Sequence, residues 1–292
     1  FSRKEVVEYN YEMMAKILSE AKVSYIKWDM NRSITECYSV ALPADRQGEV
    51  FHRYILGVYD LYERLTSEFP EVLFESCSSG GGRFDPGMLY YAPQGWTSDD
   101  SDAIERLKIQ YGTSLCYPIS SMGSHVSVIP NHQVFRKTPL HTRANVAYFG
   151  TFGYELDLNS LKEEEIAEVK EQIIFMKKYR KLFQFGDFYR LKSPFEGNET
   201  IWMVVSEDKK TAIVGYYRTL NGVNQAYSRI KLQGLDPDML YENILNKTEN
   251  YGDELMNFGL ITTDVTAGEV PGDATPCTDF ESRIYILKAK EK

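Results

Sequence analysis

Cysteine is scarce in this sequence, and the cysteines that occur are far apart. The 292 residues contain four, and neighbouring ones are separated by about 40 residues or more. Structural zinc sites and disulfide frameworks depend on closely spaced cysteines, usually in small chains. Neither is expected here, and reduced thiols are the simplest interpretation of Cys37, Cys77, Cys116 and Cys277.

The sequence also lacks an excess of positive charge and any long apolar run. It has 33 Lys and Arg against 42 Asp and Glu, a formal charge of -9 and a pI of about 5.2. Phosphate backbones and anionic lipid surfaces therefore do not attract it. No run approaches the roughly 20 apolar residues that span a bilayer, and residues 1–5 lack the core of a signal peptide. We expect no nucleic-acid or membrane partner, and a cytoplasmic location.

Motifs for common cofactors and metals are missing as well. The glycines at 80–82 belong to neither a GxxxxGK[ST] nor a GxGxxG pattern, and the four histidines form no HExxH pair. Ser78-Ser79-Gly80 is not the GxSxG turn of a serine hydrolase. The sequence predicts neither a cofactor nor a metal site.

What is present in the first part of the chain is an alternation of strand and helix patterns. Apolar residues recur at helical spacing in some segments, and short β-prone runs separate these segments. The elements predicted are helices over 4–21 and 51–65, strands over 23–29 and 72–77, a helix around 104–111, a strand and loop within 114–132, and a long charged helix after Lys162. The alternation is typical of parallel strands joined by helices. We expect capping boxes at Ser2–Glu5 and at Ser160–Glu163.

After about residue 186 the sequence changes to β-prone runs separated by turns, which predicts an antiparallel β-sandwich. We therefore expect two domains, 1–186 and 187–292. The first contains about five strand-helix units, whereas a closed (β/α)₈ barrel has eight. The predicted fold class is α/β, a partial (β/α)₈ barrel with about strands 4 to 8, followed by the antiparallel sandwich.

Two carboxylates, Asp29 and Asp99, lie where β-prone runs end. In a parallel barrel the carboxyl ends of the strands share one mouth, so the two side chains are expected to face each other. Glycosidases need such a pair, because one carboxylate stabilises or attacks the anomeric carbon while the other protonates the leaving oxygen. Trp28 and Trp96 next to the acids offer flat faces for a sugar, and Lys27 and Asn31 offer polar contacts.

Simpler interpretations exist for these residues. An aspartate at a strand end is more often a helix cap or a solvated loop residue than a catalyst, and the acids at 99–102 precede a predicted helix. Trp28 could belong to the barrel core.

At these strand ends the sequence resembles the retaining α-galactosidases of glycoside hydrolase family 36. The resemblance runs along nearly the whole chain and is sharpest over residues 23–158. The main motifs are Lys27-Trp28-Asp29-Met30-Asn31-Arg32, Phe74-Glu75-Ser76-Cys77-Ser78-Ser79-Gly80-Gly81-Gly82-Arg83-Phe84-Asp85 and Trp96-Thr97-Ser98-Asp99-Asp100.

The resemblance implies hydrolysis of terminal α-galactosyl residues, as in melibiose and raffinose, by double displacement. Asp29 matches the nucleophile and Asp99 the acid/base, with their carboxyls roughly 5 to 5.5 Å apart. The resemblance implies substrate contacts at Lys27, Asn31, Cys77, Gly80 and Trp96. We add their neighbours Trp28, Ser78 and Ser79 as predicted substrate-binding residues. Ser79 departs from the glycine that many family members have at its position.

The resemblance also implies a longer protein and an oligomer. Family members carry an N-terminal sandwich and the first barrel strands before the position that matches Phe1, and they are often tetramers. A homo-oligomer, a tetramer by resemblance, is therefore expected, and the isolated chain is expected to be poorly active. The alternatives are a truncated, non-catalytic galactoside-binding or assembly fragment, and an α-N-acetylgalactosaminidase.

Overall fold

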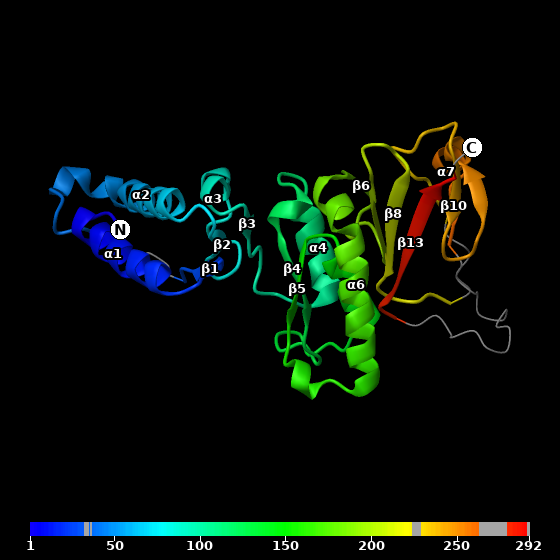
Figure 1. Cartoon of the computed structure of the whole chain (residues 1–292), viewed down its shortest axis with the longest axis horizontal. Coiled ribbons are helices and arrows are strands. Elements are labelled where there is room, and N and C mark those ends of the chain that lie inside the picture. Colours follow the sequence, from blue (N-terminus) through cyan, green and yellow to red (C-terminus); the bar gives the residue numbers. More distant parts are fainter. Residues whose placement is uncertain (32–34, 36, 224–228, 263–278, 291–292) are drawn as a thin grey trace. The chain divides into compact units, whose positions relative to one another are not determined.

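The computed structural model describes residues 1–31, 35, 37–223, 229–262 and 279–290, and divides the chain into two compact units (Figure 1). Unit 1 is Phe1–Asp99 and unit 2 is Asp100–Lys292. None of the helices within these ranges is both long enough and apolar enough to cross a membrane.

Unit 1 is a small parallel sheet with helices on one side. Its strands are hydrogen-bonded in the order β1-β2-β3, with both pairs parallel. Its elements are α1 (Lys4–Glu20), β1 (Tyr25–Asp29), η1 (Ala44–Glu49), α2 (Val50–Glu68), β2 (Leu73–Cys77), α3 (Pro86–Tyr91) and β3 (Gln94–Gly95). The core lies between sheet and helices, where Leu61, Tyr62 and Leu65 of α2 pack in one cluster with Phe74 of β2. The helical and strand patterns of the sequence are confirmed here.

Unit 2 begins with a second set of parallel strand-helix elements. Strands β4 and β5 pair in parallel, with Gly123 opposite Thr151. The elements are α4 (Ala103–Thr113), η2 (Ile119–Ser121), β4 (Gly123–Ser127), α5 (Leu140–Ala147), β5 (Thr151–Glu155), η3 (Leu158–Ser160) and α6 (Glu163–Phe185). They confirm the predicted helix around 104–111, the strand within 114–132 and the long charged helix.

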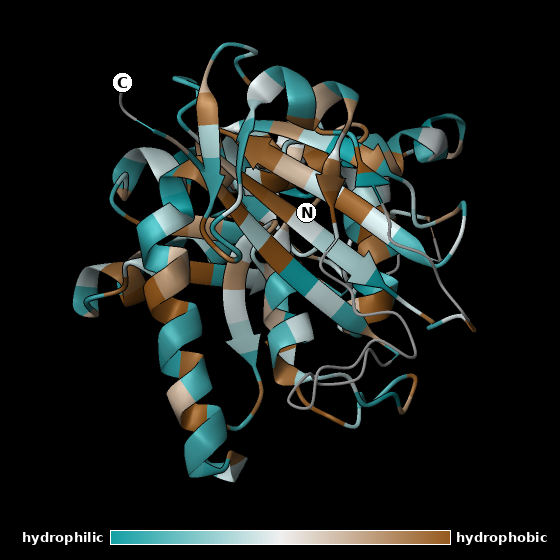
Figure 2. Cartoon of the chain, turned by 90° about the vertical axis from the view of Figure 1, so that its right-hand side faces the viewer, coloured by the Kyte–Doolittle hydropathy of each residue, from teal (hydrophilic) through white to brown (hydrophobic). Residues whose placement is uncertain are grey.

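The rest of unit 2 is antiparallel. Its main sheet has the strand order β11-β10-β13-β8-β7-β6, and β12 pairs with β9 in a two-stranded sheet. The elements are β6 (Asp187–Lys192), β7 (Glu199–Val205), β8 (Thr211–Arg218), β9 (Arg229–Ile230), β10 (Leu240–Asn243), β11 (Glu249–Tyr251), α7 (Gly252–Asn257), β12 (Leu260–Ile261) and β13 (Glu281–Ala289). Hydrophobic colouring runs along the strands of the main sheet in Figure 2.

Both faces of the central strands β7 and β8 are covered. Met203 and Val214 on one face belong to a core that includes Leu255 of α7 and Leu260 of β12. On the other face, the Trp202 ring lies 5.4 Å from that of Phe149, which follows α5. Burial on both sides explains why these strands are continuous apolar runs without alternation.

The predicted fold class, a partial parallel barrel followed by an antiparallel sandwich, is confirmed. The compact units divide at Asp99, within the parallel part, because α5 packs against the antiparallel sheet inside unit 2: the Tyr217 hydroxyl donates to the Asn145 carbonyl at 2.6 Å. The domain boundary near residue 186 stays a prediction.

Two predicted capping boxes are wrong. Arg3, and not Ser2, is the N-cap of α1, and its guanidinium bonds Glu5. At α6 the N-cap is Lys162, whose N–H donates to Glu165 Oε2 at 2.9 Å. The N-cap lies one residue after Ser2 and two residues after Ser160, so the serine hydroxyls are out of register with the free N–H groups.

Candidate active site

The candidate site lies on the face of the unit 1 sheet that the helices leave uncovered. Successive side chains of a strand point to opposite faces, so Lys27 and Asp29 share one face of β1. In the register of the sheet Lys27 is opposite Glu75, and Asp29 is opposite Cys77. The two strands therefore bring a cation, two carboxylates and a thiol to one face.

Trp28 lies on the opposite face of β1. Its ring centroid is 4.6 Å from that of Tyr62 on α2, and it packs against the apolar core of unit 1. The indole is therefore used in packing between sheet and helix, and the contact of Trp28 with a sugar stays a prediction. The simpler interpretation of Trp28 as a core residue is the one the structure favours.

Trp96 follows β3 and lies next to Lys27. The Lys27 Nζ is 4.9 Å from the centroid of the Trp96 ring, within the range of a cation–π contact. The backbone N–H of Trp96 donates to the Ser76 carbonyl at 2.9 Å, which fixes the start of the segment leading to Asp99. Trp96 is buried, and its contact with Lys27 joins it to the polar face.

Asp29 is held by the residue two positions further along the chain. The Asn31 side-chain amide donates from Nδ2 to Asp29 Oδ2 at 2.8 Å, and Asn31 Oδ1 accepts from the backbone N–H of Ser79 at 2.6 Å. This hydrogen bond fixes the orientation of the Asp29 carboxylate. Asn31 thereby connects the end of β1 to the glycine-rich loop after β2.

That loop in turn lies directly against the backbone of Asp99. Gly80 has φ +76, and a Cβ placed on it would be 2.7 Å from Ser98 Cα and 2.8 Å from Asp99 N. Only glycine permits both this conformation and this approach. A continuous series of contacts therefore runs from Asp29 through Asn31, Ser79 and Gly80 to Asp99. The predicted separation of the two carboxyls stays a prediction.

Ser78 and Ser79 have different parts in this loop. The buried Ser78 hydroxyl donates to the Met30 carbonyl at 2.8 Å and so ties the loop to the end of β1. Ser79 has φ +46, in the left-handed region that favours glycine. The sequence predicted both serines as substrate contacts, and this stays a prediction. In the structure the Ser78 hydroxyl holds the loop to the end of β1.

Cys77 is a buried thiol opposite Asp29. Burial raises its pKa from the usual value near 9 to about 11, and a hydrogen bond to the Asp29 carboxylate acts in the same direction. The thiol therefore stays protonated at neutral pH and is available as a donor to Asp29. Cys77 is the predicted contact that lies beside the predicted nucleophile.

Glu75 was missed by the sequence prediction of the site. It is 3 % exposed on the same face, with Oε1 3.9 Å from Lys27 Nζ. The signal that identifies it is the alternation of β2, because Glu75 and Cys77 are two residues apart and Cys77 was already a candidate.

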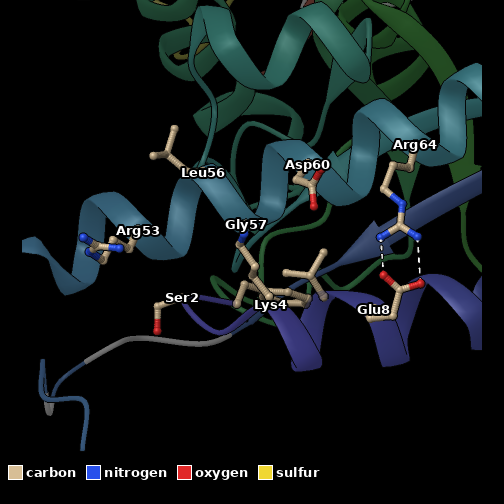
Figure 3. A pocket seen from close by; sticks show the side chains of 10 residues that line it. Ser2, Lys4, Glu8, Arg53, Leu56, Gly57, Asp60 and Arg64 are labelled. Atoms are coloured by element: carbon tan, nitrogen blue, oxygen red, sulfur yellow. Dashed lines mark hydrogen bonds and ion pairs between the residues drawn. The ribbon is translucent and has the colours of Figure 1, made fainter. Parts of the chain in front are cut away.

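A cavity in unit 1 lies between α1 and α2 and involves none of these residues. It encloses about 430 Å³. Figure 3 shows the bidentate ion pair along it, in which Arg64 Nη2 and Nη1 donate to Glu8 at 2.9 and 3.0 Å. In the described part of the chain, no group of three His, Cys, Asp or Glu side chains is arranged to hold a metal ion.

Exposed carboxylates that follow parallel strands, beside a lysine and an amide, are an arrangement typical of glycoside hydrolases. Residues 1–186 match the family model described as melibiase, and residues 199–287 match the C-terminal domain of glycosyl hydrolase family 36. The chain belongs to the melibiase family.

Curated and solved relatives agree with this assignment. The chain is 55 % identical to α-galactosidase AgaA of Geobacillus stearothermophilus and 48 % identical to α-galactosidase Mel36A of Lactobacillus acidophilus. The alignments cover 100 % and 98 % of this chain and 38 % of each relative. The α-galactosidase of Lactobacillus brevis matches 100 % of this chain and 39 % of its own, with a TM-score of 0.94 and 50 % identity. The chain thus spans well under half the length of these relatives.

Proposed function

We propose that this chain carries both catalytic carboxylates of a retaining α-galactosidase that hydrolyses terminal α-galactosyl residues, as in melibiose and raffinose-type sugars. The observation that carries the proposal is the series of contacts that joins Asp29 at the end of β1, through Asn31 and the Gly80 loop, to the backbone of Asp99. Membership of the melibiase family supports the substrate class.

Solved complexes of AgaA support the same assignment. One AgaA variant has been determined with raffinose and carries an aspartate-to-asparagine substitution, and another, with stachyose, carries an aspartate-to-alanine substitution. The two substituted aspartates are separated by the same number of residues as Asp29 and Asp99. This spacing supports matching Asp29 and Asp99 to those two positions.

In the proposed first step, a carboxylate oxygen of Asp29 attacks the anomeric carbon while protonated Asp99 gives its proton to the leaving oxygen. The product is a glycosyl ester on Asp29 and a free leaving alcohol. In the second step Asp99 takes a proton from water, which attacks the same carbon and releases galactose with retained configuration. Lys27 contributes positive charge next to the reacting face, and Asn31 keeps the Asp29 carboxylate oriented.

The proposal also covers the location, the oligomeric state and the partners of the protein. The acidic composition and the resemblance to family 36 support a cytoplasmic homo-oligomer, a tetramer by resemblance. The same features support a galactoside as the partner, with no nucleic acid or membrane.

The direct test is a chimera in which this chain replaces the matching segment of AgaA. We expect the chimera to hydrolyse p-nitrophenyl α-galactoside, and Asp29→Ala and Asp99→Ala each to reduce turnover by about 10⁴-fold or more. Asp60→Ala, an exposed acid on α2, is the matched control and should retain activity.

Azide distinguishes the two roles. With Asp29→Ala it should replace the nucleophile and give the β-galactosyl azide, whereas with Asp99→Ala it should attack the glycosyl-enzyme and give the α-azide. A folded chimera that binds galactose without turnover would instead support the non-catalytic alternative. Turnover of N-acetylgalactosaminides in preference to galactosides would support the alternative that the protein is an α-N-acetylgalactosaminidase.

A further inference from the structure

Glu75 stands out among the charged side chains of unit 1, because it is almost fully buried in the middle strand of the sheet and has no part in the mechanism above. It is 3 % exposed and lies opposite Lys27 of β1 and Gln94 of β3. Burying a carboxylate is costly unless its oxygens are paired. The contacts of the two oxygens therefore indicate what this residue does.

The two oxygens of Glu75 have different surroundings. Oε2 accepts from the Tyr25 hydroxyl and from Gln94 Nε2, the latter at 3.0 Å. The Gln94 amide also donates to the Tyr25 hydroxyl at 2.6 Å, so both flanking strands fix the same oxygen. Among the described residues, Oε1 accepts no hydrogen bond, and the cation beside it is Lys27, with Nζ 3.9 Å away.

Tyr25 is suited to hold Oε2 of Glu75 in place. Burial, followed by its hydrogen bond to Glu75, raises the pKa of Tyr25 well above its usual value. The hydroxyl therefore stays a donor across the physiological range. With Oε2 held by donors from β1 and β3, the carboxylate cannot turn, and Oε1 stays directed at Lys27.

Lys27 is held between this carboxylate and an aromatic ring. Its side chain is 39 % exposed, and its Nζ lies 4.9 Å from the Trp96 ring centroid on one side and 3.9 Å from Glu75 on the other. A lysine has four rotatable bonds and samples many conformations unless partners restrict it. Glu75 and Trp96 together restrict it to the face on which Asp29 lies.

We propose that Glu75 is a positioning residue, which acts through Lys27 and holds its ammonium group beside Asp29 for contact with the galactosyl hydroxyls. Glu75 does not touch the sugar itself. The proposal rests on the proposed function for its consequence in catalysis. The restraint of Lys27 by Glu75 can be tested without it.

The first test uses the chain itself and the acetylation of its lysines by acetic anhydride at fixed pH, measured by mass spectrometry. Glu75→Gln keeps the shape of the side chain and an acceptor for Tyr25, but removes the charge that holds the protonated amine. Labelling of Lys27 should rise about two- to fivefold, the range of a partly exposed ion pair. Labelling of Lys22, which is exposed, is the internal reference.

Glu68→Gln is the matched control, because Glu68 also accepts from a tyrosine hydroxyl, that of Tyr11, and belongs to no contact of Lys27. It should leave Lys27 labelling unchanged. Should Glu75→Gln fail to fold, Tyr25→Phe removes one of the two donors at Oε2 and should raise Lys27 labelling by a smaller factor. Unchanged labelling in a folded Glu75 or Tyr25 variant would overturn the proposal.

The second test measures kinetics in the AgaA chimera. Glu75→Gln should lower kcat/KM for p-nitrophenyl α-galactoside about tenfold, the size of one misplaced charged hydrogen-bond partner. Glu75→Asp should restore part of it, because it restores the charge. A parent chimera without activity, together with increased Lys27 labelling in the chain, would reject the proposed function and keep the positioning of Lys27. An active chimera with unchanged kinetics in Glu75→Gln would reject the positioning role.

Discussion

The three-stranded sheet of unit 1 and the six-stranded sheet of unit 2 differ in the burial of their polar side chains. All of β7 and nearly all of β8 are buried, and polar side chains of the two strands pair with each other: Trp202 Nε1 donates to the Tyr217 hydroxyl at 2.9 Å, and the Tyr216 hydroxyl to Glu199 Oε1 at 2.8 Å. On β1 of unit 1, by contrast, Lys27 and Asp29 stay exposed.

This difference separates the part of the chain that stabilises it from the part that reacts. A sheet covered on both faces gains free energy of folding from each buried side chain. The face that carries Asp29 gives up that gain and keeps charges and strained backbone next to solvent. We therefore expect substitutions in the large sheet to change stability, and substitutions around the Gly80 loop to change catalysis.

The largest expected effect on stability is that of Trp202→Ala in the antiparallel sheet. Trp202 is fully buried and its indole packs 5.4 Å from the Phe149 ring. Its removal leaves a cavity and takes away the indole N–H that donates to the Tyr217 hydroxyl, at a cost of about 3–5 kcal/mol. Denaturant unfolding measures it. Leu245→Ala, at a 57 % exposed position, should cost less than about 0.5 kcal/mol, and equal costs would contradict the comparison.

Gly80→Ala tests the catalytic side of the comparison. The added methyl meets the backbone of Ser98 and Asp99 at 2.7 and 2.8 Å, so Asp99 must move. A displacement of about 1 Å at a catalytic group can cost about 10²-fold in rate. We expect a loss of this size in kcat/KM of the AgaA chimera. Gly48→Ala, where the new methyl meets nothing within 4 Å, is the control and should retain activity.

Replacing each of the two loop serines with glycine should change the free energy of unfolding in opposite directions. Ser79 has φ +46, so Ser79→Gly relieves a left-handed conformation and should raise the free energy of unfolding by about 1 kcal/mol or less. Ser78→Gly removes the hydrogen bond to the Met30 carbonyl and should lower it by about 1 kcal/mol. Thermal unfolding compares them. A loss of stability in both would show that the strain at Ser79 is offset by its side-chain contacts.

The smallest effect on stability is expected for substitution of Cys77, and this effect depends on pH. The folded thiol keeps its proton up to a pKa of about 11, whereas an unfolded thiol loses it near 9. Between these values the folded state binds more protons, so the contribution of Cys77 to stability is complete below pH 9 and is lost as pH rises toward 11. Cys77→Ser should unfold with a weaker pH dependence in this range.

Iodoacetamide provides a second readout for the same thiol. At pH 8 the exposed Cys116 should be alkylated well before Cys77. Fast alkylation of Cys77 would show that its thiol is neither buried nor held protonated.

The sequence predicted the elements of the site better than their contacts. Asp29 could be found because a polar residue ends a β-prone run, which is a local signal. The role of Trp28 could not, because its partner Tyr62 lies on α2 and only the packing of helix on sheet decides which face is covered. Glu75 was missed for a related reason, since its meaning depends on Tyr25 and Gln94 from two other strands.

The fold shows the same limit. The change from alternating elements to β-prone runs near residue 186 is visible in the sequence, and the strands found there are antiparallel. The N-caps, found at Arg3 and Lys162, were misplaced by one or two residues, because a cap depends on backbone conformation that propensity does not fix.

The central claim is that Asp29 forms the covalent bond to the sugar. The most direct measurement is mass spectrometry of the AgaA chimera after reaction with a fluorinated α-galactoside that has a good leaving group, which slows the second step and lets the glycosyl ester accumulate. We predict a galactosyl label on the peptide that contains Asp29. A label on Asp99, or on a residue outside this chain, would contradict the account.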